Sequence, residues 1–173
     1  MDVVSRKDIE AAASRINGRV RRTPVIQLEE AAFGIDAEIF LKLELFQHTG
    51  SFKPRGAFNR ILSADVPRAG VITASGGNHG QAVAYASKVL GIDAEIFVPE
   101  GSPSLKAERI RRHGAALTVT GQYYDDAMDA CRSRALETGA LLVHPYDHPD
   151  VVAGQGLVGQ EMEAQLPDVD TVL

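Results

Sequence analysis

The amino-acid sequence predicts an α/β protein built around a parallel sheet. Between residues 70 and 143, short apolar runs rich in strand-forming residues alternate with segments of helical periodicity. The apolar runs are 71–73, 94–98, 116–119 and 141–143, and the helical segments lie near 79–90, 103–112 and 124–138. Strands that alternate with helices favour right-handed crossovers, which place neighbouring strands parallel to one another.

Two helices and a strand are expected before this alternating region. Ser5 and the aspartate three residues later have the spacing of a capping box, which predicts a first helix over 5–17. The segment 37–44 alternates in the manner of a half-buried strand. Ser51 is then expected to cap a helix that ends near residue 62.

One more helix is predicted after this region, over 151–165. The last residues, 171–173, are apolar and have strand character, so the chain is expected to stop inside an element. Strands ordinarily run for about five or six residues. We therefore expect this sequence to be part of a longer protein.

Composition and charge narrow the class of function. The 173 residues are 45% hydrophobic and carry a net charge of −5, which favours a globular protein with a small-molecule partner over a nucleic-acid binder. No apolar run approaches the ~20 residues that span a bilayer, and the N-terminus lacks the apolar stretch of a signal peptide. The single cysteine cannot form an internal disulfide. A cytoplasmic protein that does not cross a membrane is expected.

Lys53 lies within the first turn of the helix predicted after Ser51. Unpaired backbone N–H groups and the helix dipole disfavour a positive charge there, and Phe52 would desolvate the amine further, so the basicity of Lys53 should fall. A deprotonated lysine can form an imine with an aldehyde cofactor. From spacing alone, a surface lysine beside an ordinary cap is the alternative.

A glycine-rich turn follows the predicted strand at 71–73. The run 75–80 reads Ser-Gly-Gly-Asn-His-Gly and leads into a helix, so its backbone N–H groups can converge on a carboxylate or phosphate. Asn78 offers an amide that can bond a phenolic oxygen, and His79 offers a titratable ring. A tight turn with Asn78 as helix cap and a solvated His79 is the alternative.

Two further patterns are similar to ligand-binding motifs, one for a dinucleotide and one for a metal, but their sequence context does not suit either ligand. The run 154–159 has the letters of a dinucleotide fingerprint, but it does not follow a strand directly. His144 and His148 have a metal-ligand spacing only if helical, and Pro145 prevents a regular helix, so turn residues are the better interpretation and no metal is expected.

The residues 123–126, Tyr-Tyr-Asp-Asp, open a predicted helix. Acidic residues favour the positive end of the helix dipole, so capping explains the two carboxylates adequately. A tyrosine that reaches a substrate is the alternative.

The runs 50–57 and 75–81 together resemble the threonine/serine dehydratase and serine racemase family of pyridoxal phosphate enzymes, which has the tryptophan-synthase-like fold. The resemblance extends through 42–44, 97–100, 144–147 and 153–156 at the family's spacing. It implies that 1–66 begins a large domain, that 67–147 forms a small α/β domain, and that 148–173 returns to the large domain.

The resemblance also implies a role for each matching residue. Lys53 would hold pyridoxal phosphate as a Schiff base, Phe52 would pack by the pyridine ring, and Asn78 would bond the phenolic oxygen. The substrate carboxylate would be held by Ser75, Gly76, Gly77 and His79.

Two positions indicate the dehydratase branch. Cysteine synthases and threonine synthases carry a threonine after the loop asparagine, where this sequence has His79, and racemases place an acid/base serine at the position of Gly76. The implied reaction is β-elimination of water from L-threonine, L-serine or both, which gives a 2-oxo acid and ammonia. Serine racemase-type activity, and a catalytically silent domain that binds a carboxylate or a partner, are the alternatives.

The family's glycine-only phosphate loop and the residue that meets the pyridine nitrogen fall after residue 173. The isolated chain is therefore expected to be inactive, and activity is expected from a longer parent protein. We expect that parent to be a homo-oligomer. Serine or threonine preference and activation by a metal or nucleotide are left open.

Overall fold

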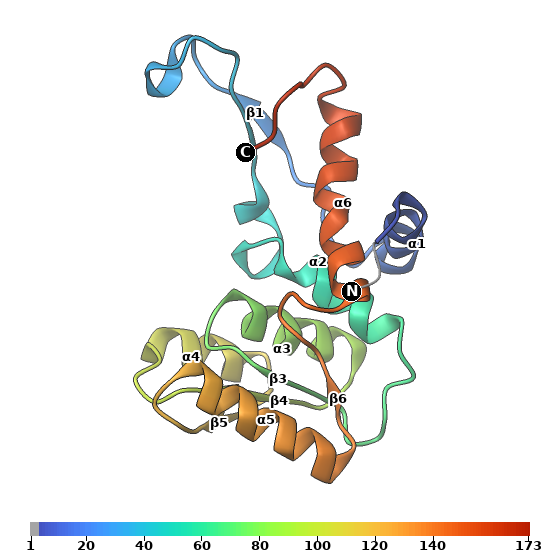
Figure 1. The fold of residues 1–173 in the computed structure, drawn as a ribbon, viewed down its shortest axis with the longest axis vertical. Coiled ribbons are helices and arrows are strands. Elements are labelled where there is room, and N and C mark those ends of the chain that lie inside the picture. The colour runs from blue at the N-terminus through green and yellow to red at the C-terminus, as the bar shows by residue number, and fades with distance from the viewer. Residues whose placement is uncertain (1–3) are drawn as a thin grey trace.

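The computed structural model describes residues 4–173 and has two parts arranged along its long axis (Figure 1). One part is a four-stranded sheet in the order β5-β4-β3-β6. Its strands are β3 (Val71–Ala74), β4 (Ala94–Val98), β5 (Ala116–Val119) and β6 (Leu141–Leu142). All neighbouring strands are parallel, which confirms the predicted sheet.

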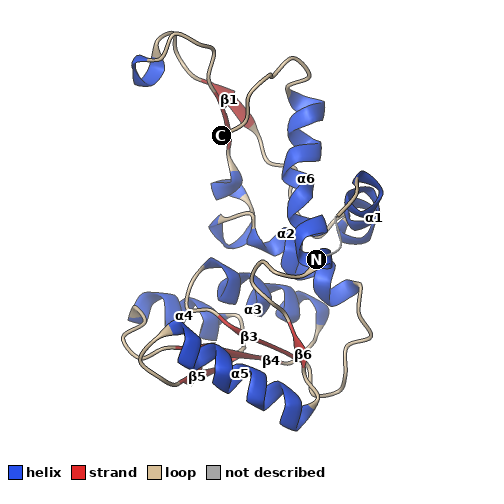
Figure 2. Cartoon of the chain, in the orientation of Figure 1, coloured by secondary structure: helices blue, strands red, loops and turns tan. Residues whose placement is uncertain are grey.

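Helices cover both faces of this sheet, as Figure 2 shows. α3 (Asn78–Leu90) and α4 (Ser104–Arg112) lie on one face, and α5 (Tyr124–Thr138) lies on the other. Alternate strand residues point to opposite faces, so one core contains Val71 and Ile96 and the other contains Ile72 and Phe97. Burial on both faces explains why these strands appear as nearly continuous apolar runs.

The other part combines three α-helices and three short 3-10 helices (Ala32–Gly34, Glu44–Phe46 and His48–Gly50) with a two-stranded antiparallel sheet. The α-helices are α1 (Arg6–Ile16), α2 (Lys53–Leu62) and α6 (Pro149–Gln165), and the strands are β1 (Val25–Gln27) and β2 (Phe40–Lys42). Ala57 and Phe58 of α2 share one apolar core with Ala82 and Val83 of α3, so α2 joins the two parts. Within residues 4–173, no helix is long and apolar enough to cross a membrane.

Most predicted elements form with small changes at their ends. Ser5 caps α1 through the expected capping box, and α6 begins two residues before the predicted start, with a proline in its first turn. The strand predicted over 37–44 is confined to β2. Residues 171–173 are exposed and form no strand, because neither sheet in the described part of the chain extends to them.

The predicted cap of α2 is wrong. Ser51 has an extended backbone, and its buried Oγ has no hydrogen-bond partner among residues 4–173. Phe52 occupies the cap position without a capping side chain, and α2 begins at Lys53. Pro54 suits the first turn of a helix, because it lacks the N–H that would otherwise stay unpaired there.

The glycine-rich run 154–159 lies inside α6 and does not form a strand-to-helix turn, so the dinucleotide alternative is excluded. A Cβ on Gly154 would lie 2.5 Å from the carbonyl oxygen of Arg55, and a Cβ on Gly56 would lie 2.9 Å from that of Val151. These glycines allow the backbones of α2 and α6 to approach each other closely.

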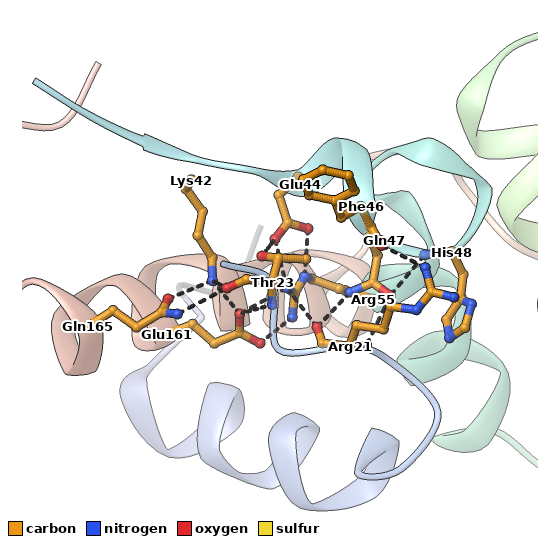
Figure 3. A network of polar contacts seen from close by, with 10 residues as sticks. All are labelled: Arg21, Thr23, Lys42, Glu44, Phe46, Gln47, His48, Arg55, Glu161 and Gln165. Carbon is orange, nitrogen blue, oxygen red and sulfur yellow. Dashed lines mark hydrogen bonds and ion pairs between the residues drawn. The ribbon is translucent and has the colours of Figure 1, made fainter. Parts of the chain in front are cut away.

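A buried ion-pair network fixes α2 against its surroundings (Figure 3). The Arg55 side chain is fully buried, and its guanidinium bonds both oxygens of Glu44 at 2.7 and 2.9 Å. It also bonds Glu161 of α6 at 2.7 and 3.0 Å. Lys42 of β2 donates to Glu161 at 2.6 Å and to Gln165 at 2.7 Å. Segments from three regions of the sequence therefore meet at one guanidinium.

Opposite charges inside this network shift the pKa values of Arg55 and Glu161. Burial lowers the pKa of Arg55, but hydrogen bonds to Glu44 and Glu161 outweigh it and raise the pKa above its usual value. Burial raises the pKa of Glu161, and the bonds from Arg55 and Lys42 outweigh that effect and lower it. Arg55 and Glu161 are thus held in their charged forms by their partners.

We predict that Arg55→Ala lowers the free energy of unfolding of the chain by about 3–5 kcal/mol, because it leaves two carboxylates without their buried partner. Urea unfolding of the wild type and the variant measures this loss. Arg112→Ala is the matched control: its pair with Glu108 is exposed, and its removal should cost less than about 0.5 kcal/mol. Equal losses in the two variants would contradict a stabilising role of the network.

Candidate active site

Three segments converge around Lys53, the first residue of α2. Its Nζ donates a hydrogen bond of 2.8 Å to the carbonyl oxygen of Pro145, which lies just after β6. The start of α3 contacts the same segment, since His79 bonds the carbonyl oxygen of Val143 at 3.0 Å. The structure therefore brings together the lysine and the glycine-rich turn, although they lie more than 20 residues apart in the sequence.

The environment of Lys53 makes its amine less basic than that of an exposed lysine. Burial lowers the pKa of Lys53, and no carboxylate pairs with it among the described residues. A contact that opposes this effect is the cation–π contact with Phe52, whose ring centroid lies 5.1 Å from Nζ, because it favours the charged amine. A lysine that is partly desolvated and has only a neutral carbonyl as its partner is suited to covalent chemistry with an aldehyde.

The turn at 75–77 leaves the N-terminus of α3 open to an anion. Gly77 occupies the cap position and no side chain caps the helix, so the first N–H groups of α3 have no partner from a cap. A Cβ on Gly77 would meet only the Ser75 hydroxyl, at 3.9 Å, whereas one on Gly80 would collide with the Ser75 carbonyl oxygen. The turn thus provides both space and N–H donors for a carboxylate.

The structure does not support the alternative in which Asn78 caps the helix and His79 is solvated. Asn78 is the first residue of α3 and not its cap, and its exposed side chain makes no hydrogen bond within residues 4–173. The His79 imidazole is 3% exposed and points toward the Val143 carbonyl oxygen, so it is not solvated. Its ring faces the protein interior, and only its backbone N–H belongs to the open turn.

Burial shifts the titration of His79 strongly. Burial is the largest cause, the hydrogen bond to Val143 opposes it, and the charges of Lys53 and His144 add to it, so that together they lower the pKa of His79 from 6.5 to about 4. The imidazole is therefore neutral at neutral pH.

Ser102 belongs to the site and is missed by sequence reasoning. A Cβ on Gly76 would lie 3.0 Å from the Ser102 Oγ, which donates a hydrogen bond of 2.8 Å to the Pro99 carbonyl oxygen. A side chain at residue 76 would therefore have to displace that hydroxyl. The order of the strands could have predicted this contact. β3 and β4 are parallel neighbours, so the segments that follow their carboxyl ends, which contain Gly76 and Ser102, lie side by side.

The histidines after β6 act as turn residues, as predicted. His144 Nδ1 accepts a hydrogen bond of 2.8 Å from the Asp147 N–H, and His148 Nδ1 accepts one of 3.2 Å from the Asp150 N–H at the start of α6. The described residues contain no group of three or more metal-ligating side chains.

One of the two acidic residues at the start of α5, Asp126, caps that helix. Asp126 accepts hydrogen bonds of 2.9 Å from the N–H groups of Gln122 and Tyr123. This confirms the capping interpretation of that carboxylate. The two tyrosines remain candidates for a contact with a substrate.

A parallel α/β scaffold that presents a desolvated lysine beside an open helix N-terminus is suited to an enzyme that holds an aldehyde cofactor. The sequence profile of the family described as "Pyridoxal-phosphate dependent enzyme" matches residues 16–173. The chain belongs to this family of pyridoxal phosphate enzymes, which confirms the resemblance, the fold class and the cofactor inferred from the sequence.

Curated relatives are similar over nearly the whole chain. It is 42% identical over 167 residues to the L-threonine ammonia-lyase of Geobacter sulfurreducens, covering 95% of this chain and 42% of the relative. It is 39% identical over 173 residues to the L-threonine ammonia-lyase of Thermotoga maritima, covering 99% and 43%. The chain thus spans less than half the length of these two relatives.

Solved structures show the same fold. A threonine deaminase from T.th. superposes with a TM-score of 0.87 at 39% identity, covering 94% of this chain and 52% of that one. Maize serine racemase superposes with a TM-score of 0.88 at 35% identity, covering 95% and 50%.

The residues present fit the cofactor of this family. The Lys53 amine has no carboxylate to compete with an aldehyde, and the Asn78 amide has no protein partner within residues 4–173. The Cβ-free surface of Gly77 leaves open space beside them. Pyridoxal phosphate would supply an electron sink here for charge that develops on the substrate's α-carbon.

We predict that the buried His79 makes the stability of the chain fall with falling pH. Between pH 6.5 and about 4 the unfolded chain binds a proton at this residue that the folded chain does not, so the free energy of unfolding drops as pH falls. The contribution lost by pH 4 is about 3 kcal/mol. Urea unfolding at pH 7, 5.5 and 4 should show His79→Gln losing less stability than the wild type. A wild-type minus variant difference that is constant with pH would contradict this.

Proposed function

We propose that these residues serve a β-elimination of water from L-threonine, L-serine or both, with pyridoxal phosphate as cofactor, giving a 2-oxo acid and ammonia. The observation that carries the proposal is the Lys53 amine, which is partly buried, has no carboxylate partner in residues 4–173, and lies near the uncapped end of α3. The names of the relatives, L-threonine ammonia-lyases, support the substrate class.

In this proposal Lys53 has two roles. It would hold the cofactor covalently, and its Nζ, when free, would take the α-proton of the substrate. A lowered pKa suits the second role, because a less basic lysine loses its own proton more readily and its free amine can then accept the α-proton. The Pro145 carbonyl oxygen, 2.8 Å from Nζ, gives the freed amine a fixed neighbour.

The turn at 75–77 and the start of α3 orient the substrate in this proposal. An unpartnered helix N-terminus attracts a carboxylate through its N–H groups and its dipole. His79 contributes its backbone N–H, since its ring is buried. Phe52 packs by the cofactor ring, Asn78 bonds its phenolic oxygen, and the carboxylate is held by Ser75, Gly76, Gly77 and His79.

The arrangement of the whole protein is part of the proposal. Residues 1–66 and 148–173 contribute to a large domain, and 67–147 form the small α/β domain. The protein that carries them acts in the cytoplasm on a small amino acid, as a homo-oligomer, without a nucleic-acid partner.

Racemisation is the second candidate, and Ser102 is the observation that favours it. Racemases carry a serine at the position of Gly76. In this chain the Ser102 hydroxyl lies 3.0 Å from the place that a Cβ of residue 76 would occupy. A chiral assay for D-serine in the same reaction mixtures as the ammonia assay distinguishes the two reactions.

We predict that borohydride reduction of the full-length protein with pyridoxal phosphate leaves a pyridoxyl group on the peptide that contains Lys53. Lys53→Ala should abolish that adduct and lower ammonia release from serine and threonine by at least about a thousandfold, because both the covalent link and the α-proton acceptor are lost. Peptide mapping and an ammonia assay measure these effects. Lys106→Ala, an exposed lysine of α4, is the control and should keep both. An adduct elsewhere, or undiminished turnover in Lys53→Ala, would overturn the proposal.

A further inference from the structure

The carbonyl oxygen of Val143 accepts two buried side-chain hydrogen bonds. Thr73 Oγ1 of β3 donates to it at 2.7 Å, and His79 Nε2 of α3 bonds it at 3.0 Å. The two donor residues are 0% and 3% exposed. The end of β6 is therefore fixed from two different elements, in addition to its own backbone hydrogen bond to Ile72.

Two residues further on, the Pro145 carbonyl oxygen accepts the hydrogen bond from Lys53. Proline restricts its own φ angle and disfavours helical conformations in the residue before it, so the three-residue link from Val143 to Pro145 is short and stiff. A shift at the Val143 carbonyl would thus be transmitted to the acceptor of the Lys53 amine.

The chemistry of the imidazole suits a fixed donor. A carbonyl oxygen can only accept, so Nε2 carries the proton of the neutral ring. The other nitrogen, Nδ1, is buried and has no partner within residues 4–173. A second proton there would add a buried positive charge close to Lys53, so the ring remains a neutral donor.

We propose that the His79 side chain is a positioning residue, which holds the Val143 carbonyl and so keeps the Pro145 carbonyl at the Lys53 amine. The inference rests on the proposed function of Lys53 and adds a role for the imidazole, which is separate from substrate binding by the backbone of the turn. If His79 were simply a satisfied core residue, its replacement by an apolar side chain of similar size would leave the Lys53 amine in place.

Three variants separate these roles. His79→Gln keeps an N–H donor that can reach the Val143 oxygen, and His79→Leu fills a similar volume without any donor. Thr73→Val removes the other donor with almost no change of shape, and it guards against a His79→Leu variant that fails to fold. Urea unfolding of each variant fixes conditions in which all of them are folded.

The first measurement needs no cofactor and uses the 173-residue chain. Nuclear Overhauser contacts between the Lys53 ε-methylene and the protons of Pro145 and Tyr146 report the position of the amine. We expect these contacts in the wild type and in His79→Gln, and at least a severalfold loss in His79→Leu, with Thr73→Val intermediate. Contacts that persist in His79→Leu, or that disappear equally in His79→Gln, would overturn the proposal.

The second measurement uses the full-length protein with pyridoxal phosphate. We expect His79→Leu to lower kcat for ammonia release about tenfold or more while KM changes less than about twofold, and His79→Gln to restore most of kcat, because the amine acts in the chemical step. A rise in KM alone, or an unchanged kcat, would overturn the positioning role. If borohydride trapping still labels Lys53 of the wild type, that result leaves the proposed function intact. If borohydride does not trap pyridoxal phosphate on Lys53 of the wild type, the proposed function itself is contradicted.

Discussion

The buried guanidinium of Arg55 is the interaction on which the arrangement of this chain depends. An arginine without contact to water is tolerated only when carboxylates neutralise it and accept its hydrogen bonds, and here Glu44 and Glu161 do both. These residues come from separate regions of the sequence, so their pairing fixes how α2, α6 and the segment after β2 pack together (Figure 3). The close contact of α2 with α6 at Gly56 and Gly154 places the guanidinium where both carboxylates reach it.

The position of Lys53 follows from this constraint. It lies two residues before Arg55 at the start of the same helix, so a fixed α2, which shares an apolar core with α3, also fixes the position of the lysine. From the other side, the segment after β6 supplies the Pro145 carbonyl as its acceptor. The sheet brings the turn at 75–77 to the same place, because that turn follows the carboxyl end of β3.

Local patterns predict those parts of the fold that local chemistry decides. The strands β3 to β6 are recognisable because both faces of the sheet are covered, and the start of α1 is recognisable because Ser5 and Asp8 cap it within four residues. The cap predicted at Ser51 is wrong because its buried Oγ bonds no N–H of α2, whose cap position is taken by Phe52. Residues 171–173 have strand character, but a strand also requires a partner, which a short apolar run does not reveal.

The less predictable features of the site rely on contacts between distant residues. Arg55 and Glu161 are 106 positions apart, and the bond from His79 to Val143 spans 64. Sequence reasoning brings Lys53 and the turn at 75–80 together through a family resemblance, but it does not show that the His79 ring points inward or that Ser102 lies against Gly76. Those facts depend on which strands are neighbours in the sheet.

The protonation midpoint of the Lys53 side chain tests this account most directly. Nuclear magnetic resonance can follow the ε-methylene of Lys53 from neutral to alkaline pH in the folded chain and in the same chain unfolded by urea. Because burial lowers the pKa of Lys53 and no carboxylate in residues 4–173 offsets that effect, the folded midpoint should lie below the unfolded one. A folded midpoint equal to or above the unfolded midpoint would contradict the claim that the fold prepares this lysine for chemistry.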